Sequence, residues 1–139
     1  MTFSATRGAQ GYRAAQTQTS SGVELVVMLY DGALRFIADA ERAIEAGDLK
    51  ARATGIRKAL AIVGELRSTL VMTRGGAVAE ELDRLYDYIQ DRLVAVTRDQ
   101  HREGLAEARA VLTSLADAWR TIAAGGAQAP PVMSSASHP

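Results

Sequence analysis

Apolar residues recur at every third or fourth position in four successive segments of this chain, a spacing typical of amphipathic α-helices. The segments cover about residues 22–46, 49–74, 77–98 and 102–123. Leu49 begins the apolar stripe of the second segment and Val78 that of the third, so both are expected in the core. Only a few residues separate consecutive segments, and short connections make consecutive helices neighbours. Because no segment shows the alternation of a β-strand, the sequence predicts an all-α fold, an antiparallel four-helix bundle.

Residues that favour helix ends stand at the segment boundaries. Ser21 precedes the first segment and is typical of an N-cap. Gly47 follows that segment as a C-terminal glycine, and Asp48 is placed to cap the second helix. The pair Gly75 and Gly76 marks the predicted end of the second helix.

Composition places the chain among single-domain proteins with one core. It has 139 residues and no cysteine, so disulfides, thiol nucleophiles and zinc fingers are excluded. Lys and Arg together number 16, as do Asp and Glu, so no net charge attracts nucleic acid. No apolar run approaches the roughly 20 residues that span a bilayer, and the polar N-terminus lacks the apolar centre of a secretory signal. A cytoplasmic protein without membrane insertion is expected.

The two ends differ in composition from the middle of the chain. Residues 1–19 are rich in Ala, Gly, Gln and Thr and predict a mobile N-terminal arm, with Tyr12 as an aromatic anchor. Residues 125–139 are rich in Gly, Ala, Pro and Ser and predict a disordered C-terminal tail. The bundle domain is therefore expected over residues 20–124.

No group of side chains has the spacing of a catalytic or metal site. His101 lies in a predicted loop near Asp99 and Glu103, without a second histidine at ligand spacing. A histidine phosphotransfer domain would need an exposed histidine in mid-helix, so a solvated loop residue is the favoured interpretation. Carboxylates of the third segment lie on its solvent face beside Arg84, as on any solvated helix. The sequence predicts a protein without enzymatic activity, cofactor or metal.

More apolar residues stand on these helices than one core stripe needs. Met28 and Leu34 lie off the main stripe of the first segment, Ile62 and Leu66 beside that of the second, and Tyr88 just outside that of the third. Each alone is ordinary bundle packing, but together they predict grooves for an amphipathic partner helix. A bundle that self-associates through the same surfaces as a scaffold is the alternative.

Several motifs, in order, resemble the flagellin export chaperones of the FliS family. They are ELVVMLYDGALRFI at 24–37, AIEAGD at 43–48, the Gly-Gly pair at 75–76, LYDY at 85–88, RL at 92–93 and DAWR at 117–120. Tyr12 also stands at the family's distance ahead of the first motif. The resemblance extends over about residues 12–122 without an evident gap.

The resemblance implies a helical bundle that binds the disordered C-terminal segment of flagellin, prevents its premature polymerisation and supports its delivery to the flagellar type III export apparatus. A flagellar export gate protein is a further implied partner. The candidate contacts for the flagellin client are Tyr12, Met28, Leu34, Ile62, Leu66 and Tyr88. In the family the N-terminal segment covers the client groove, which would make Tyr12 a displaceable plug. Tyr30, Tyr86 and Trp119 are expected to pack inside the bundle and fix the groove shape.

Overall fold

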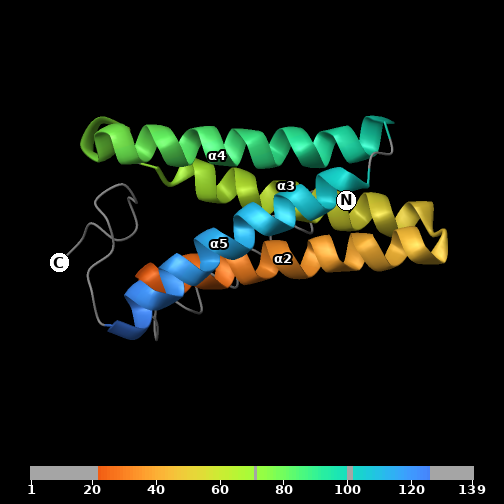
Figure 1. Ribbon diagram of the computed structural model, residues 1–139, viewed down its shortest axis with the longest axis horizontal. Coiled ribbons are helices and arrows are strands. Elements are labelled where there is room, and N and C mark those ends of the chain that lie inside the picture. The colour runs from red at the N-terminus through yellow and green to blue at the C-terminus, as the bar shows by residue number, and fades with distance from the viewer. Residues whose placement is uncertain (1–21, 71, 100–101, 126–139) are drawn as a thin grey trace.

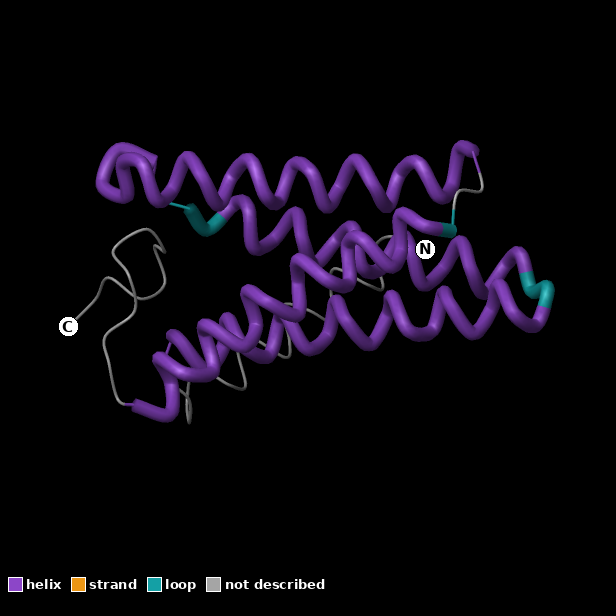
Figure 2. The backbone as a smooth tube through the Cα atoms, in the orientation of Figure 1, coloured by secondary structure: helices purple, strands orange, loops and turns teal. Residues whose placement is uncertain are grey.

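The computed structural model describes residues 22–70, 72–99 and 102–125 of the chain. They form four helices, α2 (Gly22–Ala46), α3 (Leu49–Ser68), α4 (Met72–Asp99) and α5 (Glu103–Gly125). Successive helices run in opposite directions along the long axis, so α2 begins and α5 ends at the same end of the molecule (Figure 1). Within these residues Figure 2 shows helices joined by short connections and no strand. The predicted all-α antiparallel four-helix bundle is confirmed.

The helices form a square arrangement in which α2 and α4 are diagonal. Helix α2 packs against α3 and α5, and α4 packs against the same two helices. One continuous core of apolar side chains fills the centre. Its largest fully buried members are Tyr30, Tyr86, Ile37, Ile56, Leu66, Ile89, Leu93, Leu105, Leu112, Val26 and Val63.

The turn between α2 and α3 has the predicted chemistry. Gly47 adopts a φ of 72°, a left-handed conformation that glycine takes without steric cost. The backbone N–H of Asp48 donates to the Ala43 carbonyl at 2.9 Å. The Asp48 side chain accepts a hydrogen bond from the Ala51 N–H at 3.0 Å, so it caps α3. The predicted cap at Ser21 lies outside the described residues.

The predicted end of the second helix at Gly75 and Gly76 is wrong. Helix α3 ends at Ser68, whose hydroxyl donates to the Glu65 carbonyl at 2.8 Å. The Thr69 hydroxyl donates to the Leu66 carbonyl at 2.7 Å. The Thr69 N–H also donates to the Leu66 carbonyl at 3.2 Å, so tighter backbone bonds and these hydroxyls together close the last turn of α3. Gly76 instead interrupts α4, with a φ of 55° inside that helix.

Two residues expected in the core are exposed. Leu49 is 64% accessible and Val78 is 55% accessible. Leu49 is the first residue of α3, and Val78 follows the interruption of α4 at Gly76. Helix ends extend past their neighbours in a bundle, so an apolar spacing continued to the first turn does not ensure burial.

Ion pairs join three of the four neighbouring helix pairs in the described part of the chain. Between α2 and α5, Glu41 binds Arg109 at 3.3 Å and Asp31 binds Arg120; Glu45 of α2 also binds Arg102, the residue directly before α5. Between α3 and α4, Arg67 binds Asp83 through two nitrogens, at 2.6 and 3.2 Å, and also Asp87 at 3.2 Å. Between α4 and α5, Arg92 lies 3.8 Å from Glu107. The remaining pair, α2 and α3, is joined by close packing instead.

No described helix combines the length and apolar character needed to cross a membrane.

Candidate partner-binding surface

Residues of α2 and α3 meet in an antiparallel register that can be followed along both helices. The Lys58 ammonium lies 5.3 Å from the centre of the Phe36 ring. One turn away, a Cβ atom on Gly32 would lie 3.2 Å from Cδ1 of Ile62. Continued by four residues on each helix, the same pairing would bring Met28 toward Leu66. We call this line of contacts the α2–α3 seam.

A glycine sets the spacing of the two helices. A Cβ atom at Gly55 would lie 2.8 Å from the backbone oxygen of Phe36 and 3.1 Å from the backbone nitrogen of Ala40. Backbone atoms cannot give way as a flexible side chain does, so a larger residue at position 55 would separate α2 from α3. Gly55 therefore allows a close approach of these helices.

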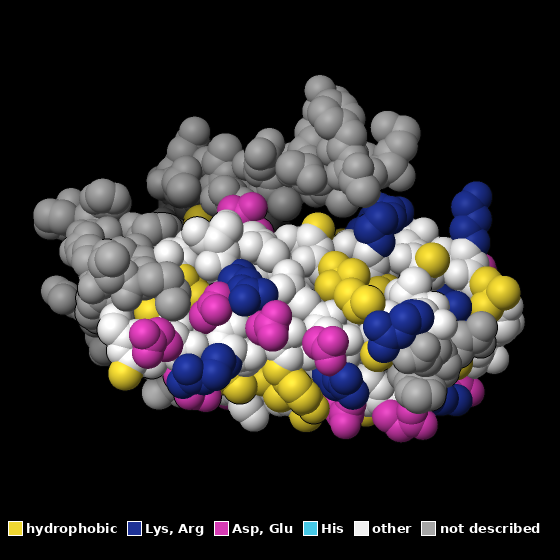
Figure 3. Space-filling model, turned by 90° about the horizontal axis from the view of Figure 1, so that it is seen from above, with side chains coloured by type: hydrophobic (Ala, Val, Ile, Leu, Met, Phe, Trp, Pro, Cys, Tyr) yellow, Lys and Arg dark blue, Asp and Glu magenta, His cyan; other side chains and the backbone are white. Residues whose placement is uncertain are grey.

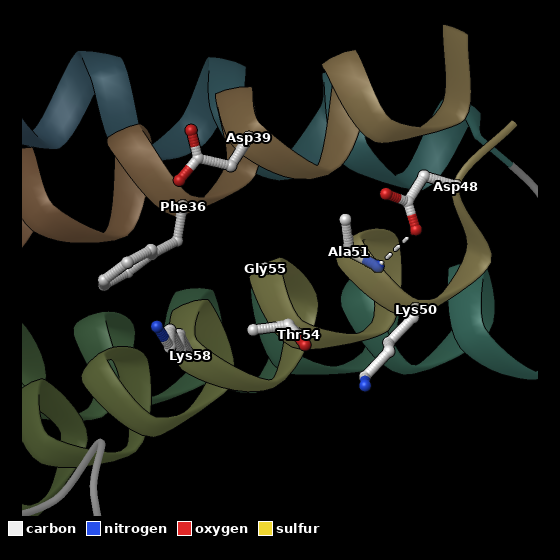
Figure 4. A pocket seen from close by; sticks show the side chains of 8 residues that line it. All are labelled: Phe36, Asp39, Asp48, Lys50, Ala51, Thr54, Gly55 and Lys58. Carbon is white, nitrogen blue, oxygen red and sulfur yellow. Dashed lines mark hydrogen bonds between the residues drawn. The ribbon is translucent and has the colours of Figure 1, made fainter. Parts of the chain in front are cut away.

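A groove opens on the outer side of the seam next to Gly55. Its volume is about 460 Å³, and the residues that line it are Phe36, Asp39, Asp48, Lys50, Ala51, Thr54, Gly55 and Lys58. Figure 4 shows the Phe36 ring and the Lys58 side chain directed toward one another across it. The residues of α3 at its floor are small, which leaves the Phe36 ring partly uncovered. We call this site the Phe36 groove.

The two carboxylates at the Phe36 groove have hydrogen-bond or ion-pair partners, and two cations lie near the Phe36 ring. The Asp48 carboxylate accepts the capping bond from Ala51, drawn as a dashed line in Figure 4, and Asp39 is paired with Arg42. The Arg35 guanidinium lies 5.2 Å from the Phe36 ring centre, beside the same ring that Lys58 approaches. Two cations therefore contact one aromatic ring at this groove.

Three of the six residues expected to contact a partner belong to the two helices that form the seam. Met28, Ile62 and Leu66 lie along the α2–α3 seam. Met28 is half-buried, Ile62 is 9% accessible and Leu66 is fully buried. Leu66 therefore belongs to the core in this conformation, and Ile62 lies beneath Gly32.

Two others lie elsewhere on the bundle, and the sixth is outside the description. Leu34 follows Asp31 by one turn on the side of α2 that faces α5, and it packs partly against the core. Tyr88 is 41% accessible on α4, and the Arg92 guanidinium lies 5.7 Å from its ring centre. Tyr12 lies outside the described residues, as does His101.

The described residues visible on the α4 side form a mixed surface. Seen from that side in Figure 3, apolar side chains are interspersed among acidic and basic ones. Tyr88 and Val94 are the large apolar residues most exposed on α4 beyond its first turns. Isolated residues of this kind are normal on a soluble surface.

The sequence patterns did not predict the Phe36 groove. The groove depends on the register of α2 against α3, which spacing along one helix does not reveal. One signal was present in the sequence. Lys50 and Lys58 are the only two lysines among the 16 basic residues, and both line this groove.

The centre of the bundle holds a hydrogen-bonded pair of tyrosines. The hydroxyls of Tyr30 and Tyr86 lie 2.5 Å apart, and both side chains are fully buried. Burial raises the pKa of Tyr30 to about 12, while hydrogen bonding with Tyr86 and Trp119 opposes that rise. Burial likewise raises the pKa of Tyr86. Trp119 is buried beside them, so the three residues pack inside the bundle as expected.

Among the described residues, no group of three or more His, Cys, Asp or Glu side chains is arranged to hold a metal ion.

Comparison with known proteins gives a consistent result over most of the chain. The family model for flagellar protein FliS matches residues 5–126. The flagellar secretion chaperone FliS of Salmonella typhimurium is 32% identical over 122 residues, covering 82% of this chain and 90% of the relative. FliSB of Pseudomonas aeruginosa is 34% identical over 105 residues, covering 76% and 83%. FliS of Bacillus subtilis is 34% identical over 109 residues, covering 78% and 80%.

Proposed function

The chain belongs to the FliS family of flagellar secretion chaperones, and from this we propose that it binds the disordered C-terminal segment of flagellin in the cytoplasm. Bound flagellin is kept from premature polymerisation and is delivered to the flagellar type III export apparatus, with an export gate protein as a further partner. The family assignment implies a chaperone and not an enzyme.

The observation that best supports this proposal is the α2–α3 seam. It combines the partly uncovered Phe36 ring with half-buried Met28 two turns away on the same helix. Apolar side chains in line along a helix pair form the kind of surface on which an amphipathic helix docks. A disordered client that folds there loses about 2–5 kcal/mol of its gross interaction energy to ordering, which keeps the complex releasable.

We propose that the client contacts Met28 and the Phe36 groove directly. Leu34 and Tyr88 are proposed as further contacts, since each is partly accessible. Ile62 and Leu66 support the seam from beneath in this conformation. Tyr12 remains a proposed contact of the N-terminal arm, and the division into an arm (1–19), a bundle domain (20–124) and a tail (125–139) remains a prediction.

Two exposed alanines of α3 offer a matched test. Ala51 lines the Phe36 groove, whereas Ala61 is exposed on the same helix and is not among the groove residues. Ala51→Trp fills the groove without removing a core side chain, so it should weaken binding of a labelled flagellin C-terminal segment about tenfold in fluorescence anisotropy. Ala61→Trp should bind as the wild type does.

Both variants should keep the wild-type helical content in circular dichroism. Equal binding by Ala51→Trp and wild type would place the client elsewhere on the bundle. Absence of binding by the folded wild type would contradict the proposed function itself.

A further inference from the structure

We infer that the Phe36 groove recognises acidic side chains of the client through Lys50 and Lys58, and that this contact fixes the register of the client helix along the α2–α3 seam. The inference rests on the proposed function, because it specifies which part of the client lies in the groove.

The first observation is the placement of the lysines. The chain has 16 basic residues, only Lys50 and Lys58 are lysines, and both line the same groove. No described carboxylate forms an ion pair with either ammonium group, although most arginines on the described helices have such a partner. Lysine presents a compact charge on a flexible stem, which suits contact with a carboxylate whose position is not fixed in advance.

The second observation concerns the acidic groups at the groove. Asp48 already accepts the N-cap bond of α3, and Asp39 is paired with Arg42. Neither carboxylate forms an ion pair with Lys50 or Lys58. A client carboxylate would meet these cations without first breaking an existing ion pair.

The third observation is the Phe36 ring. The Arg35 and Lys58 cations lie 5.2 and 5.3 Å from its centre. A client carboxylate beside the ring edge would therefore meet two positive charges. The ring itself offers apolar surface. The groove thus fits a segment that presents acidic groups next to an apolar side chain.

The distance between Met28 and the Phe36 groove sets the spacing expected between an apolar residue and the acidic residues on the client helix. Met28 lies eight residues before Phe36 on α2, a distance of about 12 Å along the helix. A client helix lying along the seam would place an apolar residue at Met28 and carboxylates about two turns away at the Phe36 groove. The opposite orientation or a shifted register would leave the lysines without a partner.

The experiment uses the full chain and a fluorescein-labelled flagellin C-terminal segment. The double variant Lys50→Gln/Lys58→Gln removes both charges, and Lys50→Arg/Lys58→Arg keeps them. The Gln variant should bind about fivefold more weakly at about 50 mM salt, and the difference should shrink at about 300 mM. The Arg variant should bind within about twofold of wild type. Arg84→Gln on exposed α4 is the control for loss of a positive charge elsewhere.

Carbodiimide coupling locates the contact. A client carboxylate in the groove condenses with a lysine Nζ to form an amide, so peptide mapping by mass spectrometry should find the cross-link at Lys50 or Lys58. The Arg variant should bind but lose this cross-link. Wild-type affinity of the Gln variant, or coupling only at the N-terminal amine, would overturn the inference while leaving flagellin binding intact. Failure of wild type to bind the segment would overturn both.

Discussion

The hydroxyl groups of Tyr30 and Tyr86 meet at 2.5 Å across the diagonal of the bundle, joining α2 to α4 where no ion pair between described residues does so. Both side chains are fully buried. A buried hydroxyl that loses its partner retains its desolvation penalty, so the two groups stabilise the fold as a pair.

The free energies of unfolding lost in the two single Tyr→Phe variants should therefore add up to more than the loss in the double variant. Tyr86→Phe should lower the free energy of unfolding by about 1–3 kcal/mol, because the Tyr30 hydroxyl is left without this bond. The double variant Tyr30→Phe/Tyr86→Phe should cost less than the sum of the single variants. Urea denaturation of the four proteins measures this coupling, and additive costs would contradict it.

Alkaline pH should destabilise the bundle through the same pair. The pKa of Tyr30 is raised from 10.0 to about 12 in the fold, and that of Tyr86 is raised as well. Their contribution is complete below pH about 10 and is lost as pH rises toward the folded pKa, since the unfolded chain releases these protons first. The free energy of unfolding should fall by about 1.4 kcal/mol per pH unit for each tyrosine in this range.

The Tyr30→Phe/Tyr86→Phe variant is the control for this dependence. It should lose most of the slope between pH about 10 and 12 in urea unfolding monitored by circular dichroism. An unchanged slope would show that other groups titrate there.

Replacement by alanine should have opposite effects on stability at the two α3 glycines, Gly55 and Gly64. Gly55→Ala places a Cβ atom 2.8 Å from the Phe36 backbone oxygen, and the resulting separation of α2 and α3 should cost about 1–3 kcal/mol. At Gly64 the nearest atom to a new Cβ is Nε2 of Gln90 at 3.6 Å, an ordinary contact. Gly64→Ala should therefore stabilise by up to about 1 kcal/mol through helix propensity. Thermal unfolding distinguishes the two, and equal shifts would contradict the close approach at Gly55.

Replacement of Arg67 by lysine should destabilise the protein although the positive charge is kept. Its guanidinium binds both carboxylate oxygens of Asp83 and also reaches Asp87 and Gln90, a fork that a lysine ammonium cannot reproduce. Arg67→Lys should lower the urea midpoint more than Arg84→Lys, since Arg84 pairs only with Glu81 of its own helix.

Low pH should weaken the stabilising contact between Arg67 and Asp83. Hydrogen bonding from Arg67 lowers the pKa of Asp83, so this contribution is present above the ordinary aspartate pKa and is lost as pH falls below it. Arg67→Lys should weaken that dependence. Identical midpoints for the two lysine variants at neutral pH would argue against the fork.

Periodicity along single helices predicted much of this fold. It located α2 and α5 closely and α4 from the interruption at Gly76 onward, since each buries one apolar face. It missed the start of α4 at Met72. It placed the end of α3 too late, because the hydroxyls of Ser68 and Thr69 end that helix and apolar spacing does not report them.

The candidate site was predicted only in part. Off-stripe residues on the first two helices pointed to the α2–α3 seam, but Leu66 proved fully buried. The Phe36 groove depends on the register between Phe36 and Lys58 and on the close approach at Gly55, both of which arise only when the helices pack.

Calorimetric titration of the full chain with the C-terminal segment of flagellin from the same genome, with circular dichroism of the mixture, tests the central claim most directly. Saturable one-to-one binding is expected, with more helix in the mixture than in the separate components. A folded chain that releases no heat with the segment and gains no helix would contradict it.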